Sequence, residues 1–470
     1  MPSIPEKKNL TASAADVINS IRSEVGGTFA DQVPSAINEG QALSDGTIAT
    51  REMALGTLRQ IGNVITTFQP LANAFLSALV NRIGRVIINS KMYSNPWAGF
   101  KRGLLEYGET IEELFVNIVQ AQDFDPETAE NEVFKRKIPD VRSAFHTMNY
   151  QKFYKTTVSN DQLRQAFLSF EGISDLIEKI TEALYTSANY DEYLVMKYML
   201  CYAMEHGAFH PVTIAQPTAA NSNSVVTTLK ATSEKLQFLS ADYNQAGVYN
   251  HTPKGDQYFI MTADFSSIVD VETLARAFNI DKVTLMGHTV IIDQFTFTTS
   301  ETARLQELLG TQYASLTDSI FADVPCVCVD RDFFMIFDNF QNMTEQYNGE
   351  GLYWNYWLHQ WKTFSTSPFA NAVIFTDETP AVSAVAVTPS ALTMGKGTST
   401  QFTATVTNAG FASTGVTWSI SGQQSANTRI DGQGRLYIAQ DESATTITVT
   451  ATSVFDAGKS NNATVTVSAS

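Results

Sequence analysis

The residues best suited to bind a metal ion are His206 and His210, with Glu205 beside them. Two histidines four positions apart share one face of a helix, and with a carboxylate they can form a zinc site. Gly207 stands between them, however, and glycine favours a helix end, while the HExxH order is absent. We therefore expect a helix-end histidine and a loop histidine rather than metal ligands.

A second candidate metal site is the acidic run Asp123, Asp125, Glu127, Glu130 and Glu132. Oxygen ligands at alternate positions suit calcium, but the glycine at the sixth position and the closing glutamate of a calcium loop are missing. We expect a solvated loop or a contact between subunits here.

The candidate nucleophiles are few. Cys326 and Cys328 would share one face of a strand, where a disulfide fits poorly, and no His–Asx pair accompanies them. With Cys201 they imply no disulfide framework, and we expect small core side chains. No P-loop, GxSxG or GxGxxG in a strand–helix setting occurs. We predict no catalytic, cofactor-binding or metal-binding residue, no cofactor and no enzymatic activity.

One aromatic stretch could stack on sugars, because rings bind sugar faces. In a strand-like segment, alternating rings more often pack in a core or between subunits, which is the interpretation we favour. We expect Trp418, further along the chain, to lie in the core of a sandwich. The stretch contains Tyr353, Trp354, Tyr356, Trp357, Trp361 and Phe364.

Length and charge limit the class of protein. The chain has 470 residues, beyond the ~250–300 at which a single core stops growing, so several domains are expected. Its net charge of −17 argues against a dedicated nucleic-acid reader, because an acidic surface repels phosphates, but it does not argue against a protein that encloses DNA without binding it tightly. The start has no apolar run of signal-peptide length, and we expect a soluble protein made in the cytoplasm.

Patterns along the first half predict an arm, a hairpin and a long helix. Residues 1–65 are polar apart from one short helical pattern, and we expect an extended arm before a core that begins near residue 66. Residues 95–157 alternate like a two-stranded excursion whose faces both meet solvent or neighbours. Residues 174–206 predict a helix, capped by Ser174 and ended by Gly207, of roughly 50 Å.

The second half predicts an α+β body and a separate tail. Residues 211–232 are interpreted as a loop and a return, 256–337 alternate strands with a helix at 269–278, and 352–376 look like the last strands of the main body. At Thr379-Pro380 the composition shifts to Ala, Thr, Ser and Val, which marks a boundary. Residues 381–470 contain six or seven short alternating strands, typical of an all-β immunoglobulin-like sandwich.

Several stretches are similar to a known family. LVNRIGRVII, NPWAGFKRGLLEYGETIEELF, AENEVFKRKIPDVRSAFH, LARAFNIDK, VDRDFFMIFDN and GLYWNYWLHQWKTFSTSPFANAVIF resemble the major capsid proteins of the phi-29-like short-tailed phages. The stretch AVSAVAVTPSALTMGKGTSTQFTATVT resembles a bacterial group 2 Ig-like module.

The resemblance implies a Hong Kong 97-like capsid fold, with peripheral and axial domains, followed by the Ig-like sandwich. On this interpretation the parts are an N-terminal arm (1–65), a capsid core (66–380) with an E-loop (about 92–157), a spine helix (about 174–206) and an axial domain (about 230–350), and the Ig-like domain (381–470).

The function implied is assembly: the protein would form pentamers and hexamers that close the icosahedral or elongated head of a tailed phage around double-stranded DNA, within the host cytoplasm. The arm is too short for an internal scaffold and no cleavage site is visible, so a separate scaffolding protein is expected, with a portal protein at one vertex. The Ig-like domain would decorate or bridge capsomers, or contact host cell-surface glycans.

Two other classes remain open. A surface adhesin or glycan-binding protein could carry the same Ig-like module, although no signal peptide or anchor supports it. A glycan-cleaving phage enzyme would need a pair of carboxylates in a cleft. A hydrolase assay on cell walls separates the second class from a shell protein.

Overall fold

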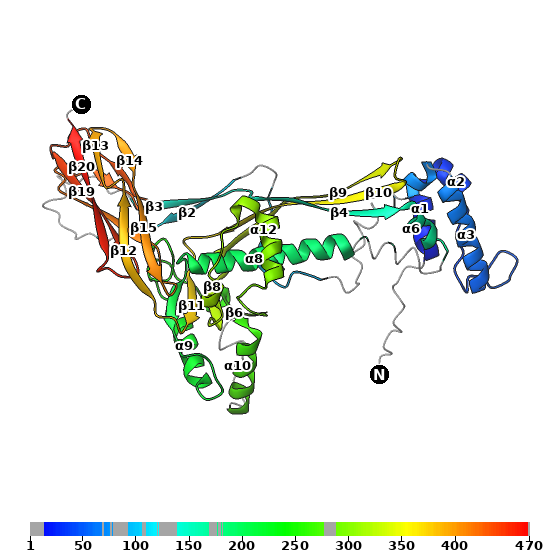
Figure 1. Cartoon of the computed structure of the whole chain (residues 1–470), viewed down its shortest axis with the longest axis horizontal. Helices are drawn as coiled ribbons and strands as arrows, with labels where there is room; N and C mark the ends of the chain where they lie inside the picture. Colours follow the sequence, from blue (N-terminus) through cyan, green and yellow to red (C-terminus); the bar gives the residue numbers. More distant parts are fainter. Residues whose placement is uncertain are drawn as a thin grey trace. The chain divides into compact units, whose positions relative to one another are not determined.

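The computed structural model of the chain is shown in Figure 1. It describes residues 14–67, 70–75, 78, 93–105, 110–119, 121, 139–168, 176, 180, 182–276 and 288–468. The chain divides into two compact units: the first comprises Met1–Ala98, Tyr150–Tyr193 and Asp338–Lys362, and the second Gly99–Asn149, Leu194–Phe337 and Thr363–Ser470. None of the described helices is long and apolar enough to cross a membrane.

The first unit is built around short helices: α1 (Ala14–Val25), α2 (Gly27–Gln32), α3 (Arg51–Thr67) and α6 (Asn160–Ala166). Ile18 and Ile21 of α1 share one hydrophobic core with Leu58, Ile61 and Ile65 of α3. The prediction of an extended arm over 1–65 is therefore wrong where the structure describes it. Gly56 and Gly62 lower the helix propensity of α3, so its helical spacing of apolar residues is easily missed.

A four-stranded sheet has the order β1 (Lys101–Leu104), β9 (Phe334–Asn348), β10 (Tyr353–Thr366) and β4 (Tyr150–Ser159). Strand β10 pairs antiparallel with β4, with Trp357 opposite Lys155 and Trp361 opposite Gln151. A 3-10 turn (Ala98–Phe100) leads into β1. The strand predicted over 352–376 is present as β10 and β11 (Ala372–Thr376).

Strands β2 (Ile111–Val116) and β3 (Val141–His146) form a separate two-stranded antiparallel sheet, with Ile111 opposite His146 and Val116 opposite Val141. We call this the β2–β3 hairpin. The excursion predicted over 95–157 is thus two-stranded only here, because β1 and β4 pair in the longer sheet instead. Alternation within a segment predicts a strand, but it does not say which strand becomes its neighbour.

Helix α8 (Ser187–Glu205) ends in a Schellman motif, in which the Gly207 N–H donates to the Met204 carbonyl and the Ala208 N–H to the Ala203 carbonyl. A π-helical turn (Glu182–Thr186) precedes it, so the segment predicted as a helix over 174–206 is helical from Glu182 to Glu205, with one π-helical turn at its start. Apolar residues about four positions apart fit an α-helical turn and a π-helical turn equally well, so the sequence pattern does not distinguish the two. The predicted cap, Ser174, lies outside the described residues.

The second unit contains a mixed five-stranded sheet in the order β5 (His210–Thr213), β11, β8 (Cys326–Asp330), β6 (Gln257–Thr262) and β7 (His288–Ile292). Its helices include α9 (Ser222–Lys235), α10 (Ala263–Arg276), α12 (Thr299–Leu309) and α13 (Asp318–Phe321), with 3-10 turns at Lys254–Asp256, Gly310–Gln312 and Arg331–Phe333. The α+β character is confirmed, but α9 replaces the loop predicted over 211–232. Helix α10 begins six residues before the helix predicted at 269–278.

Residues 381–468 form an Ig-like β-sandwich, which confirms the predicted all-β tail. Its sheets are β12–β15, β13–β20–β19–β16 and β14–β18–β17. Phe402, Leu436 and Val449 lie in its core, whereas Trp418 is half-buried and packs against that core from its edge. The strands are Ala381–Thr388, Ala391–Gly395, Ser399–Gln401, Thr403–Ala409, Val416–Ser421, Arg429–Ile430, Arg435–Tyr437, Thr446–Ser453 and Ser460–Ser468, numbered β12 to β20.

Candidate functional site

His206, His210 and Glu205, which were considered for metal binding, each form a hydrogen bond with a different partner. The Nδ1 atom of His206, just after α8, lies 2.9 Å from the Tyr202 carbonyl oxygen, and the two rings stack. His210 opens strand β5 rather than lying in a loop, and its Nδ1 lies 3.0 Å from the Asp242 carbonyl oxygen. Burial lowers the pKa of His210. Glu205 accepts a backbone hydrogen bond, so the three groups do not converge on one point.

The acidic run from Asp123 to Glu132 lies outside the described residues. Across the part of the chain that the structure does describe, no three His, Cys, Asp or Glu side chains gather closely enough to hold a metal ion.

None of the three cysteines forms a disulfide, and all three are buried. Cys326 and Cys328 of β8 pack in one hydrophobic cluster with Phe259 and Val373 of the neighbouring strands. Burial raises the pKa of both thiols, because a thiolate would lose its hydration there. These side chains fill the core of the five-stranded sheet, and a nucleophilic thiolate is disfavoured.

The aromatic stretch is divided between the two faces of β10. Trp354 and Tyr356 point into the core of the first unit, where they are 2% and 0% exposed. Trp357 and Trp361, on the opposite face, are half-buried, and Lys155 lies 5.7 Å from the Trp357 ring centroid. We call this second face the aromatic face; it comprises Tyr353, Trp357, His359 and Trp361 of β10 with Phe153 of β4.

The β2–β3 hairpin exposes large apolar side chains on one of its faces, because the strand register places Leu114, Val116, Val141 and Phe145 on the same side. Leu114 and Phe145 are 61% and 64% exposed. A two-stranded ribbon cannot bury such side chains by itself, and a group of them on a surface marks a contact with a partner. We call this group the hairpin surface: Leu114, Val116, Ile118, Val119, Val141 and Phe145. The sequence predicted that both faces meet solvent or neighbours, whereas on the opposite face Phe115 is half-buried and its ring stacks on that of Phe369.

Polar contacts fasten the base of the hairpin to the second unit. His146 is 2% exposed, with Nε2 3.2 Å from the Glu113 carboxylate and Nδ1 2.7 Å from the Ser365 hydroxyl. The Ser367 hydroxyl donates to the other Glu113 oxygen at 2.8 Å. Glu113 and His146 come from β2 and β3 respectively, so these bonds hold both strands at one end.

Two buried lysines are neutralised by carboxylates. Lys362 of β10 forms ion pairs with Glu192 of α8 and with Asp338 of β9, the latter at 2.9 Å. In the second unit, Lys197 of α8 lies 3.4 Å from Asp293 and 3.9 Å from Glu301. Removing one partner of a buried pair leaves an uncompensated charge, which typically costs ~3–5 kcal/mol. These clusters serve the fold.

A hollow in the second unit contains the carboxylates Asp264 and Asp293 in its lining, with Gln216, Phe295 and Phe321 nearby. A glycan-cleaving enzyme would need a carboxylate pair in such a place. Asp293, however, is the counterion of Lys197. The hollow therefore provides an ion pair rather than two carboxylates available for acid–base chemistry.

The comparisons with known proteins all find phage capsid proteins. The family model described as Phi29-like phage major capsid protein matches residues 18–376, and the model of the bacterial Ig-like domain (group 2) matches residues 381–461. The major capsid protein of Bacillus phage B103 is 35% identical over 433 residues, which cover 91% of this chain and 87% of the relative.

A further relative, the major capsid protein of Bacillus phage GA-1, is 36% identical over 368 residues, or 76% of this chain and 72% of its own length. Among solved structures, the capsid of Staphylococcus phage Andhra is similar with a TM-score of 0.48 at 14% identity, covering 62% of this chain and 86% of that one.

Proposed function

The chain belongs to the family of Phi29-like phage major capsid proteins, and from this premise we propose how its parts build a phage head. The protein is a structural component of the virion that assembles with copies of itself into the head shell. Its C-terminal part is a bacterial group 2 Ig-like domain.

The proposed arrangement is Hong Kong 97-like. The E-loop (about 92–157) contains the β2–β3 hairpin, the spine helix (about 174–206) contains α8, and the axial domain (about 230–350) contains most of the five-stranded sheet. The order of these elements along the chain supports the proposal. The N-terminal region 1–65 belongs to it, and the part of this region that the structure describes includes α1, α2 and most of α3.

The observation that carries the assembly mechanism is the hairpin surface. Its apolar side chains become buried when each hairpin lies across a neighbouring subunit. Each copy then places its hairpin on one neighbour and is covered by the hairpin of another. Such heterologous contacts close into rings when their rotation permits, which suits pentamers and hexamers. The shell then forms from many repeated contacts and needs no catalytic residue, cofactor or metal.

The remaining partners follow from the same function. A separate scaffolding protein guides assembly in the host cytoplasm, a portal protein occupies one vertex, and the DNA inside is held only non-specifically. The net charge of −17 supports the last point, because an acidic wall repels phosphates.

The Ig-like domain bridges or decorates capsomers, and one sheet face suggests a second role in contacting host cell-surface glycans. Across β19 and β20, Thr448 pairs with Thr464 and Thr446 with Thr466. These hydroxyls form an uncharged polar array suited to sugar hydroxyls. Assembled particles that sediment with host cell walls, and no longer do so after Thr464→Val and Thr466→Val, would support this role.

Electron microscopy of the chain expressed in bacteria with a candidate scaffolding protein tests the main proposal. We expect closed or tubular lattices tens of nanometres across. If only soluble monomers form under every condition, the assembly mechanism loses its support and an adhesin role should be tested next.

A further inference from the structure

The Ig-like domain presents a strained, buried phenylalanine to the rest of the second unit. In the turn after β15, Gly410 has φ 58° and Phe411 has φ 64°. Left-handed backbone suits glycine or asparagine and is strained for an aromatic residue. The Phe411 ring is nevertheless 2% exposed, with its centroid 5.8 Å from that of Phe321 in α13. Strain of this kind persists where packing compensates for it, so Phe411 acts as an anchor.

Glycines line the same contact where two backbones touch. A Cβ atom on Gly415, in the Ig-like domain, would lie 2.3 Å from the Gln245 carbonyl oxygen. A Cβ atom on Gly207, after α8, would lie 2.6 Å from the Ala412 carbonyl oxygen. Neither distance can be relieved by moving a flexible side chain. The close approach therefore depends on glycine on both sides of the contact.

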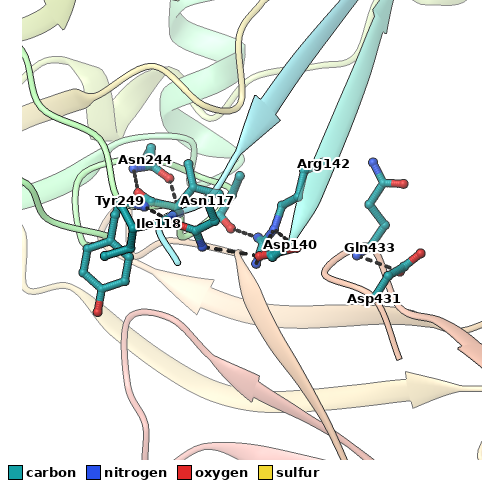
Figure 2. A network of polar contacts seen from close by, with 10 residues as sticks. Asn117, Ile118, Asp140, Arg142, Asn244, Tyr249, Asp431 and Gln433 are labelled. Atoms are coloured by element: carbon teal, nitrogen blue, oxygen red, sulfur yellow. Dashed lines mark hydrogen bonds and ion pairs between the residues drawn. The ribbon is translucent and has the colours of Figure 1, made fainter. Parts of the chain in front are cut away.

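The domain also reaches the half of the β2–β3 hairpin next to its connecting loop, away from the end that His146 and Glu113 hold. The Gln433 side chain donates a hydrogen bond of 2.6 Å to the Ser143 carbonyl of β3. Next to it, a Cβ atom on Gly432 would lie 2.4 Å from Nε of Arg142. Figure 2 shows Arg142 and Asp140 between the turn that carries Gln433 and the segment around Asn117.

Arg142 connects these parts. Its guanidinium forms an ion pair of 3.1 Å with Asp140 and donates to the Ala246 carbonyl, and its side chain is only 11% exposed. At the same loop end of the hairpin, Asn117 donates to Asp140 at 3.3 Å and accepts from the Tyr249 N–H at 3.2 Å. The hairpin, the segment around residues 246–249 and the Ig-like domain thus share one polar network.

We propose that the Ig-like domain is an internal brace, which docks on its own chain and holds the loop end of the β2–β3 hairpin, so that the ribbon has a fixed orientation. A two-stranded ribbon is marginally stable alone, so its orientation depends on what holds its two ends. Phe411 anchors the domain, the glycines allow the backbones to meet, and Gln433 with Gly432 seats Arg142. The inference concerns a single chain and does not depend on shell formation.

Hydrogen–deuterium exchange of the purified full-length chain tests the brace. We compare the wild type with Gly415→Ala, which places a methyl group against the Gln245 carbonyl. We expect hairpin amides at 111–119 and 141–146 to exchange about tenfold faster in the variant, while those of β19 and β20 stay protected. Gly395→Ala is the matched control, because its nearest neighbour would be an ordinary 3.7 Å contact with Thr398.

Gln433→Ala covers the case in which Gly415→Ala unfolds the sandwich. Gln433 is exposed, and its truncation leaves the sandwich core unchanged, so only the bond to Ser143 is lost. We expect about threefold faster exchange confined to the hairpin. Hairpin exchange unchanged from the wild type in Gln433→Ala, and in Gly415→Ala with β19 and β20 still protected, would overturn the brace.

Discussion

Glu442 is a buried carboxylate that the Ig-like domain keeps ionised. Its side chain is fully buried, and burial by itself would raise its pKa. Hydrogen bonds from the Thr428 hydroxyl and from the N–H groups of Ala444, Gln424 and Ser425 outweigh that effect and lower the pKa to about 2. The acid therefore holds together two loop segments, the one between β16 and β17 and the one between β18 and β19.

Replacing this acid tests its role. We expect Glu442→Gln to destabilise the domain by ~1.5–3 kcal/mol near neutral pH, because the amide presents one acceptor and no charge to these donors. The folded-state pKa is below the unfolded value, so the wild-type advantage is present above ~4.5 and is lost as the pH falls toward about 2. Thermal unfolding of both chains between pH 7 and pH 2 measures the difference.

The control for this prediction is Asp456→Asn, which removes the same charge. Asp456 accepts the Gly458 N–H through a single side-chain oxygen, which asparagine retains. A loss of stability as large as that of Glu442→Gln would mean that net charge, and not the hydrogen-bonded site, is responsible.

At the scale of elements, α3 shows how one helix carries two glycines with different roles. A Cβ atom on Gly62 would lie 2.5 Å from Cβ of Phe167, just after α6, whereas a Cβ atom on Gly56 would meet nothing within 4 Å. The first glycine lets the segment after α6 pack directly on α3. The second only costs the helix stability, because glycine loses more backbone freedom than alanine on folding.

Alanine substitutions at these positions should act in opposite directions. We expect Gly56→Ala to stabilise the first unit by ~0.5–1 kcal/mol, through helix propensity alone. Gly62→Ala should destabilise it by ~1–3 kcal/mol, since neither backbone can move apart without opening the core. Unfolding curves of the two variants compare them within one helix. Equal effects of the same sign would show that the contact with Phe167 is not tight.

At the scale of the whole molecule, apolar surface is left where a copy of the chain can cover it. The hairpin surface has no partner of its own within the described residues, whereas the cores of the sheets and of the sandwich are closed. The proposed brace is relevant to this surface, because an exposed hairpin can serve assembly only if it has the same orientation in every subunit.

Polar substitution of the hairpin surface should prevent assembly without unfolding the chain. We expect Leu114→Ser with Phe145→Ser to abolish lattices in electron microscopy, because both side chains are already exposed and only a partner would bury them. Circular dichroism should match the wild type. Leu114→Met with Val116→Ile keeps the surface apolar and should assemble. Normal lattices from the serine variant would mean that the hairpin does not carry the contact.

The sequence by itself determined what depends on local periodicity. Alternation predicted β10 and the strands of the tail, helical spacing predicted the α8 segment with its end at Gly207, and ordered motifs indicated the family. These features are local, because the spacing of apolar residues within a segment and the turn residues at its ends indicate whether it forms a strand or a helix.

Only the tertiary structure decided which elements meet. It paired β4 with β10, turned Trp354 inward and Trp357 outward, and set Phe411 of the Ig-like domain against Phe321. The entropic cost of bringing two distant segments together rises only slowly with the length of chain between them. One strand pattern is therefore compatible with several partner strands, and packing decides among them. The close approach at Gly415 can be recognised only in the folded structure, where the Gln245 carbonyl lies opposite. A glycine in the sequence does not show which atom will pack against it.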